Sequence, residues 1–165
     1  MERYRVAVVI CLLGLLARPA LADVSGKATD WPEGSAMSVG IHFEETKDYF
    51  LKLLIQKQAI LVDMVGSKAY KFDHSRLAKA VSQQHEAYIS YVRQECELIG
   101  SLSEAGGYWP TTYAVKCEAT MIERRYKRVS SAIKCIERLP AEERERYQGQ
   151  CLYQIAQLNM GEWKK

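Results

Sequence analysis

The residues of this chain that are best suited to covalent chemistry are its cysteines. Four of the five lie in the second half of the sequence, at Cys96, Cys117, Cys135 and Cys151. No two of them form a C-x-x-C pair, so the sequence favours neither a zinc ribbon nor thioredoxin-type redox chemistry. In an exported protein, an even number of cysteines predicts disulfide bonds rather than reactive thiols. We therefore expect two disulfides.

The histidines offer little for catalysis or metal binding. The chain has His42, His74 and His85. The last two could share one helix face, but three turns separate them by ~16 Å, which is too far for one metal ion. The sequence contains no serine nucleophile elbow, no H-E-x-x-H motif and no P-loop. Since each carboxylate also has an ordinary place on a helix surface, we expect no enzyme, no cofactor and no metal site.

The N-terminus predicts export. Arg3 and Arg5 precede an apolar run over residues 6–17, and Ala20-Leu21-Ala22 forms an A-x-A cleavage pattern. We expect residues 1–22 to be a signal peptide that is cleaved after Ala22, with Cys11 as filler in the apolar run rather than a lipid anchor. The alternative is an uncleaved N-terminal anchor, but the run is shorter than the ~20 residues that span a bilayer. The expected location is the bacterial periplasm or the exterior, with no integral membrane span after cleavage.

Removal of the signal peptide changes the charge balance. The whole chain has 23 Lys and Arg and 20 Asp and Glu. Residues 1–22 contain three of the basic residues and one of the acidic ones, so the mature chain is near +1. This balance gives no support for nucleic-acid binding, which usually needs a concentrated basic surface. It also steers the protein only weakly toward a basic partner, unless its acidic residues are clustered.

The elements that must position these residues are helical. Residues 23–40 are rich in Gly, Ser and Thr without periodicity and predict an extended leader. Apolar residues then recur near helical spacing up to Gly66, which predicts a first helix over residues 41–66. A second helix is predicted over residues 73–100, with Asp73 as its N-cap. Its apolar stripe is interrupted by Gln84 and Glu95 and consists of Leu77, Val81, Tyr88, Tyr91, Val92 and Ile99.

The third helix carries the most regular pattern. Thr111 or Thr112 can cap it after the loop, and Leu139-Pro140 ends it. Its apolar residues alternate at spacings of four and three and form one seam: Val115, Ala119, Ile122, Tyr126, Val129, Ile133 and Ile136. A fourth helix begins at Pro140 or Ala141 and is expected to bury Tyr147, Cys151, Ile155 and Leu158. The seam could instead mediate a coiled-coil dimer. However, the neighbouring helices of the same chain have matching apolar stripes, which favours an all-α antiparallel bundle of about four helices. We expect this bundle to form one domain over residues 41–165.

Helix geometry selects the disulfide pairing. Cys117 and Cys135 are 18 residues apart on the predicted third helix, or about 27 Å. Bridged Cα atoms lie only ~4.4–6.8 Å apart, so these two cannot pair. Pairing Cys96 with Cys135 would join opposite ends of an antiparallel hairpin. The remaining pairs are Cys96–Cys117, which clamps the hairpin below its loop, and Cys135–Cys151, which ties the third helix to the fourth.

The hairpin also carries a family resemblance. Its features are a glutamine pair, aromatic residues, an acid–cysteine pair, a double glycine, a second cysteine and a downstream arginine: Gln83-Gln84, Tyr88-Ile89-Ser90-Tyr91, Glu95-Cys96, Gly106-Gly107, Cys117, Thr120 and Arg124. Over residues 77–133, about a third of the chain, it resembles the lysozyme-inhibitor (LprI-like) family of exported bacterial proteins. Tyr88 stands where that family usually has tryptophan, and Arg93 is displaced by one position. The resemblance implies an envelope location, a helical hairpin and, for some members, inhibition of lysozyme.

The loop between the second and third helices is the candidate binding site. Gly106 and Gly107 permit unusual backbone angles, and Tyr108 and Trp109 place large amphipathic rings beside them. Exposed rings on a disulfide-braced loop suit insertion into a partner's cleft, because the loop is already ordered. Glu104 would favour a basic partner. The alternative is that the glycines only turn the chain and the rings cap the core.

A basic run over residues 124–128 contains four cations around Tyr126. Such a run could attract anionic lipid or polysaccharide. We interpret it instead as a solvated helix face, because Glu123 and Lys127 are spaced for an i,i+4 ion pair. Glu142 and Arg146 have the same spacing.

These observations favour a non-enzymatic binding protein. The partner would be a protein, with lysozyme or another peptidoglycan hydrolase as the target that the resemblance implies, and the mechanism would be steric occlusion by the loop. One alternative is an envelope scaffold that oligomerises through the third-helix seam. Another is an immunity protein against a secreted toxin.

Overall fold

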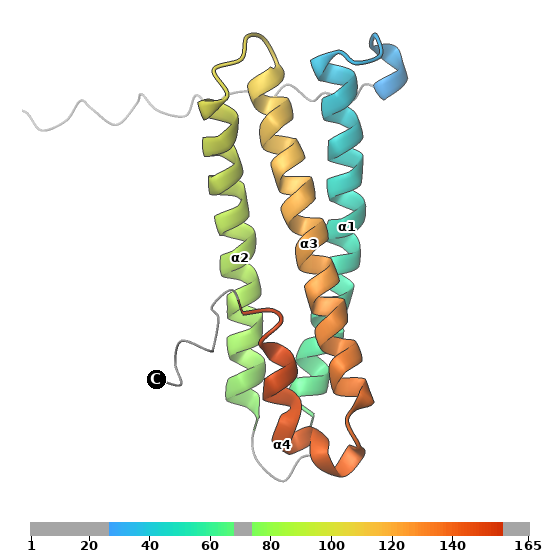
Figure 1. Ribbon diagram of the computed structural model, residues 1–165, viewed down its shortest axis with the longest axis vertical. Helices are drawn as coiled ribbons and strands as arrows, with labels where there is room; N and C mark the ends of the chain where they lie inside the picture. The colour runs from blue at the N-terminus through green and yellow to red at the C-terminus, as the bar shows by residue number, and fades with distance from the viewer. Residues whose placement is uncertain (1–26, 68–73, 157–165) are drawn as a thin grey trace, which may run out of the picture.

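The structure is a computed structural model that describes residues 27–67 and 74–156. In these residues it consists of four α-helices without a β-strand: α1 (Ala36–Val65), α2 (Ser75–Leu102), α3 (Trp109–Arg138) and α4 (Ala141–Leu152), preceded by the 3₁₀ turn η1 (Ala28–Asp30). The helices alternate in direction, and the short α4 lies beside the lower ends of α2 and α3 (Figure 1). The predicted all-α antiparallel bundle is confirmed. The proposed signal peptide, Asp73 and Leu158 lie outside the described residues.

The core runs along the centre of the bundle, and each helix contributes a stripe to it. The fully or almost fully buried apolar side chains include Leu54, Leu61, Val65, Val81, Val92, Ile122, Val129, Ile133, Ile136 and Cys151. The α3 seam is therefore used within the chain, although Val115 and Tyr126 are only half-buried. Ile155 is buried in the turn after α4, while Tyr147 is half-buried.

The first helix begins earlier than the sequence predicts. The leader was expected to extend to residue 40, but α1 begins at Ala36 because Ser35 caps it: the Ser35 hydroxyl accepts a hydrogen bond from the Ser38 N–H at 3.2 Å. Gly40 is a point of close approach rather than a helix breaker. A Cβ atom there would lie 3.2 Å from Oγ1 of Thr112 on α3.

The start of α3 also differs from the prediction. Neither Thr111 nor Thr112 is the cap, since the helix already begins at Trp109 with Pro110 in its first turn. Thr112 is buried, and its hydroxyl donates to the carbonyl of Ala36 at 2.8 Å. This contact joins the N-terminal ends of α1 and α3. At the other end of the molecule, α2 begins at Ser75, with His74 in the N-cap position.

The apolar stripe of α2 is buried over only part of its length. Tyr91 and Ile99 belong to the apolar stripe predicted for this helix, but they are exposed to 45% and 42%. The reason lies in α1, which contacts the lower half of α2, where the Gln58 amide donates to the Val81 carbonyl at 3.1 Å. Toward the upper end α1 diverges from α2, and α3 lies between them (Figure 1).

Both predicted disulfides are present. Cys96–Cys117 joins α2 to α3 with a Cα–Cα distance of 5.4 Å, and Cys135–Cys151 joins α3 to α4 at 5.5 Å. The first bridge lies near the upper end of the hairpin, and the second holds the short α4 against the bundle. Among the described residues, no helix is long and apolar enough to cross a membrane.

Gly100 allows α2 and α3 to approach one another just below the loop. A Cβ atom at this position would lie 2.5 Å from the Pro110 carbonyl oxygen and 3.0 Å from Cβ of Ala114. We expect Gly100→Ala to lower the free energy of unfolding by about 1–3 kcal/mol, because backbone would have to move. Chemical denaturation measures this change.

Gly149→Ala is the matched control. No atom lies within 4 Å of a Cβ built at Gly149 in α4, so this substitution should raise the free energy of unfolding by about 0.5–1 kcal/mol through helix propensity. Equal effects of the two substitutions would contradict the close contact at Gly100.

Candidate functional site

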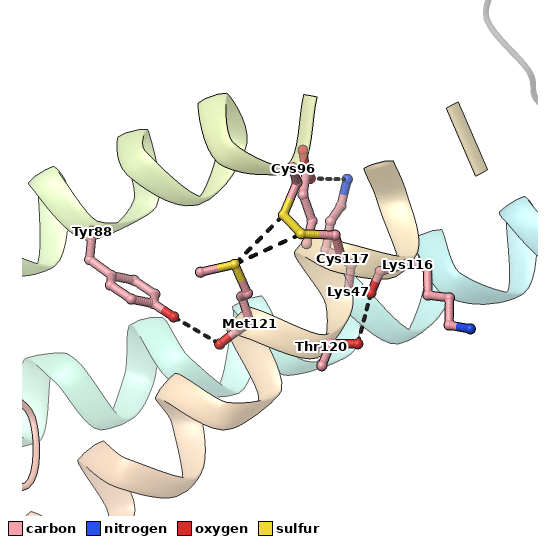
Figure 2. Close-up of a disulfide and its surroundings, with 8 residues drawn as sticks. Lys47, Tyr88, Cys96, Lys116, Cys117, Thr120 and Met121 are labelled. Carbon is pink, nitrogen blue, oxygen red and sulfur yellow. Dashed lines mark hydrogen bonds and ion pairs between the residues drawn. A yellow bond between two sulfur atoms is a disulfide. The ribbon is translucent and has the colours of Figure 1, made fainter. Parts of the chain in front are cut away.

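The candidate site is the tip loop, residues 103–108, which joins α2 to α3 at the upper end of the bundle. The Cys96–Cys117 disulfide holds the two helices together below it (Figure 2). Met121 packs against this bridge, with its Sδ atom 3.7 Å from Sγ of Cys96 and 3.9 Å from Sγ of Cys117. About two turns below Cys96 on α2, the Tyr88 hydroxyl donates to the Met121 carbonyl at 3.0 Å. The loop is therefore mounted on a rigid base.

The tip loop exposes most of the predicted binding residues. Glu104, Gly106 and Gly107 are exposed, and Tyr108 is exposed to 66%. Trp109 is the exception: it is half-buried in the first turn of α3 and stacks on Tyr113 with ring centroids 5.7 Å apart. Thus the tip loop exposes both the Tyr108 ring and the Glu104 side chain, while the Trp109 ring is only partly exposed.

Glu104 has an unusual backbone conformation. Its φ angle is 49°, and among the described residues no other non-glycine residue has a positive φ. Ser103 is the C-cap of α2, so Glu104 occupies the following position, where helices commonly place a left-handed glycine. A side chain in this conformation costs about 1–2 kcal/mol. Stability alone therefore does not explain a glutamate here, whereas a role for its carboxylate would.

Acidic residues are concentrated at the same end of the molecule. Segments 28–46 and 94–115 contain seven carboxylates and no lysine or arginine: Asp30, Glu33, Glu44, Glu45, Glu95, Glu97 and Glu104. The Thr112–Ala36 contact brings the two segments together. The nearest cations in the sequence, Lys27, Lys47, Arg93 and Lys116, border these segments. We call this end of the bundle the acidic tip.

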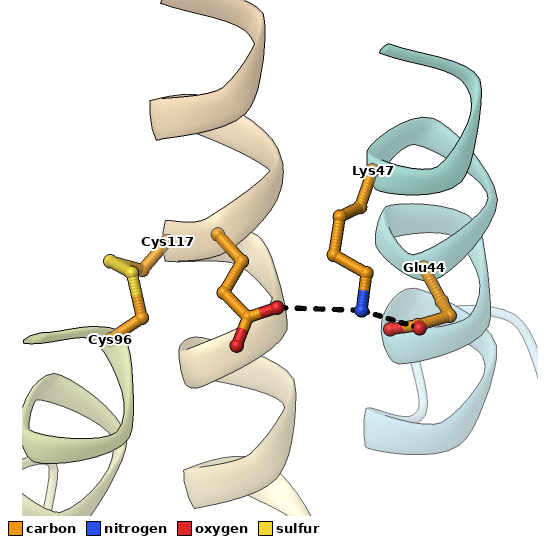
Figure 3. Close-up of polar contacts among 5 residues, drawn as sticks. Glu44, Lys47, Cys96 and Cys117 are labelled. Atoms are coloured by element: carbon orange, nitrogen blue, oxygen red, sulfur yellow. Dashed lines mark ion pairs between the residues drawn. A yellow bond between two sulfur atoms is a disulfide. The ribbon is translucent and has the colours of Figure 1, made fainter. Parts of the chain in front are cut away.

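Lys47 marks the lower border of the acidic tip. Its ammonium lies 2.5 Å from a carboxylate oxygen of Glu44 and 3.4 Å from one of Glu118, which links α1 to α3 (Figure 3). Burial disfavours the charged form of Lys47, but hydrogen bonds and charges from the two glutamates outweigh it, so its pKa is raised. Lys47 is therefore engaged within the chain, where it pairs with Glu44 and Glu118.

The structure corrects the interpretation of the basic run. Glu123 and Lys127 form the predicted ion pair at 2.6 Å, but Arg125 is not on a solvated face: it is 1% exposed. Its guanidinium donates to the Ile155 carbonyl at 2.6 Å and to the Gln84 side chain, and it lies 4.8 Å from the Tyr88 ring centroid. Arg125 therefore ties α3 to α2 and to the turn that follows α4.

The surroundings of Arg125 affect three pKa values. Burial lowers the pKa of Arg125 itself, and the neighbouring Tyr88 partly counteracts this effect. Burial raises the pKa of Tyr88. The pKa of His85 is lowered, first by burial and then by the charge of Arg125. These shifts favour a neutral His85 beside a cation, which is a structural arrangement at the centre of the bundle, away from the tip loop.

The spacing of residues on α3 indicates that Arg125 is buried. Arg125 follows Ile122 by three residues and precedes Val129 by four, so it fits the buried row at least as well as Tyr126 does. Gln84 interrupts the apolar stripe of α2 in the same way. Two polar interruptions on facing stripes predict a buried polar pair.

Within the described ranges, no group of three or more His, Cys, Asp and Glu side chains is placed to hold a metal ion. His74 lies on α4's side of the molecule, with Nε2 3.7 Å from a Glu145 carboxylate oxygen, and His85 belongs to the surroundings of Arg125. The fold and the site thus define a disulfide-braced helical bundle with an acidic, aromatic tip. Comparisons of the chain with protein-family models, with curated proteins and with solved structures find no match.

Proposed function

We propose that this protein is a non-enzymatic binding protein of the bacterial cell envelope that blocks a peptidoglycan-cleaving hydrolase, with lysozyme as the target. The acidic tip approaches the basic enzyme, and the tip loop occludes its cleft with the Tyr108 ring. No chemical step is required. The two disulfides are compatible with the oxidising compartment that this function needs.

The observation that carries the proposal is the coincidence of charge and exposed aromatic surface. The mature chain as a whole would be nearly neutral, but the two segments of the acidic tip hold seven carboxylates and no lysine or arginine, and of these Glu44 pairs with Lys47 at the border. This clustering supplies the electrostatic steering that net charge alone would not provide. Tyr108 is a rigid amphipathic anchor of the kind that dominates binding energy at protein interfaces.

The alternative of an oligomer formed through α3 has less support. The seam that would mediate such assembly is buried against the other helices of the same chain. An immunity protein against a secreted toxin would use the same tip, so the choice of enzyme decides between these two functions.

The test is lysozyme activity on cell walls, titrated with the secreted protein with both disulfides formed. We expect dose-dependent inhibition that Tyr108→Ala weakens by at least about tenfold, as for a hot-spot aromatic. Tyr49→Ala is the matched control, since Tyr49 is similarly exposed, at 61%, but lies on α1 outside the tip loop. Absence of inhibition at large excess, or equal effects of both variants, would refute the proposal.

Glu104 provides a second test, because binding and stability should respond in opposite directions. We expect Glu104→Gly to leave the free energy of unfolding unchanged or to raise it by up to about 1 kcal/mol, since glycine adopts the left-handed backbone without strain. The same variant should inhibit lysozyme more weakly because it removes a carboxylate from the tip.

Glu104→Gln separates the effect of the carboxylate charge from the effect of the left-handed backbone conformation. It keeps the strained conformation and should match the wild type in stability while losing inhibition as Glu104→Gly does. If Glu104→Gly inhibits as well as the wild type, the carboxylate has no part in binding.

A further inference from the structure

The upper part of α2 carries apolar side chains that no other helix among the described residues covers. Tyr91, Leu98 and Leu102 follow at helical spacings of seven and four residues, and Ile99 adjoins them. Their exposed fractions are 45%, 53%, 70% and 42% in the order Tyr91, Leu98, Leu102 and Ile99. We call these four residues the outer face of α2. Exposed apolar residues gathered in this way mark interaction sites more often than singly scattered ones do.

The outer face is open because the bundle is incomplete at this level. Lower on α2, α1 covers the helix through the contact of Gln58 with the Val81 backbone. The short α4 also lies at that end, where Glu145 approaches His74. In the upper half α1 has diverged, and α3 contacts the opposite side of α2 through the disulfide and Gly100. Within residues 27–67 and 74–156, no helix occupies the position that would cover the outer face.

The charged residues on the upper part of α2 indicate what kind of helix would cover the outer face. Glu95 lies within the outer face, four residues after Tyr91 and three before Leu98. Glu97 and Glu104 lie on the same segment, which contains no lysine or arginine from residue 94 to residue 115. An apolar surface that contains a carboxylate, such as that of Glu95, is complementary to a helix that has one apolar side flanked by lysine or arginine.

We propose that the outer face of α2 binds a cationic amphipathic helix of a partner protein, which packs as an additional helix against the upper half of the bundle. Its apolar side covers Leu98, Ile99 and Leu102, and its basic residues pair with Glu95 and the neighbouring carboxylates. This surface is distinct from the tip loop, and the proposal stands whether or not lysozyme is the target. The four half-exposed side chains offer far less than the ~800 Å² per partner of a standard protein interface, which suits a single helix better than a second copy of this chain.

The test uses two synthetic helical peptides of about five turns with the same leucine stripe, one with lysine and the other with glutamate on its polar side. Fluorescence anisotropy of each labelled peptide is followed as the secreted, oxidised protein is added. We expect the lysine peptide to bind, with weaker binding at higher salt, and the glutamate peptide not to bind. Leu98→Gln/Leu102→Gln should weaken binding about tenfold or more.

Tyr49→Gln/Ile55→Gln is the matched control, because these side chains are similarly exposed, at 61% and 56%, but lie on α1. The control should bind the lysine peptide as the wild type does, and thermal melts of both variants check that they fold. Equal binding of the two peptides, or equal loss in both variants, would overturn the proposal. So would a dimer in sedimentation that Leu98→Gln/Leu102→Gln dissociates, since the occupant would then be a second copy. Lysozyme inhibition measured on the same variants reports on the tip loop separately.

Discussion

Arg125→Ala is expected to lower the free energy of unfolding by about 3–5 kcal/mol. The side chain is 1% exposed, so truncation removes packing that no other residue replaces. It also removes the donor from two acceptors, the Ile155 carbonyl and the Gln84 side chain. A buried acceptor without its donor costs about 1–3 kcal/mol. Urea denaturation followed by circular dichroism measures the loss.

The neighbouring arginines provide the controls. Arg124 and Arg128 belong to the same run but are exposed, so their replacement by alanine should change stability by less than about 0.5 kcal/mol. Arg125→Met keeps most of the buried volume without the charge and should be less damaging than alanine. A loss at Arg125→Ala no larger than that at Arg124→Ala would show that the buried guanidinium contributes nothing to stability.

Removal of the Cys96–Cys117 bridge by Cys96→Ala/Cys117→Ala is expected to cost about 3 kcal/mol, as its sequence separation of 21 residues suggests. Its distinctive effect should be local. The bridge holds α2 to α3 directly below the tip loop, so its loss should speed hydrogen exchange at the loop and weaken lysozyme inhibition, because the loop would then be ordered only on binding. Hydrogen exchange by mass spectrometry and the cell-wall assay measure the two effects.

The other disulfide is the matched control. Cys135→Ala/Cys151→Ala opens a bridge of similar separation, 16 residues, but between α3 and α4 at the far end. It should cost a similar amount of stability while leaving inhibition and exchange at the tip loop near those of the wild type. Equal loss of inhibition in both variants would mean that stability, and not bracing of the loop, governs binding.

The helical bundle and its disulfides were largely predictable, because they depend on the spacing of apolar residues and cysteines along the sequence. The regular α3 seam required a long continuous helix, and that helix excluded the Cys117–Cys135 pairing by its length alone. The remaining pairs, Cys96–Cys117 and Cys135–Cys151, then placed the second and fourth helices against the third. Such inferences need only helix rise and disulfide reach.

The structure differs from the sequence-based prediction at positions where one helix contacts another. Gly40 and Thr112 looked like leader and cap residues, but both belong to the contact between α1 and α3: Gly40 leaves room for the Thr112 side chain, whose hydroxyl donates to the Ala36 carbonyl. Tyr91 and Ile99 belong to the predicted apolar stripe of α2, and the divergence of α1 from α2 leaves them exposed. Crossing angles are decided by the whole bundle, so periodicity on one helix shows which side is apolar but not how far along its length that side is covered.

The candidate site was predictable in part. The double glycine and adjacent rings located the tip loop, and the exposure of Tyr108 agrees with a binding role. The acidic tip could not be found from net charge, because four of its seven carboxylates lie between residues 30 and 45, before α1 or in its first turns and far from the loop in sequence. Burial of Arg125 likewise depends on Gln84 and Ile155, which only the folded chain brings to it.

The central proposal is that the tip binds lysozyme, and calorimetric titration of lysozyme with the protein, with both disulfides formed, tests it most directly. The account predicts saturable one-to-one binding that weakens as salt is raised and weakens further in Glu104→Gly, even though that variant is no less stable than the wild type. Absence of binding at high micromolar concentrations, or binding that Glu104→Gly and Tyr108→Ala leave unchanged, would contradict it.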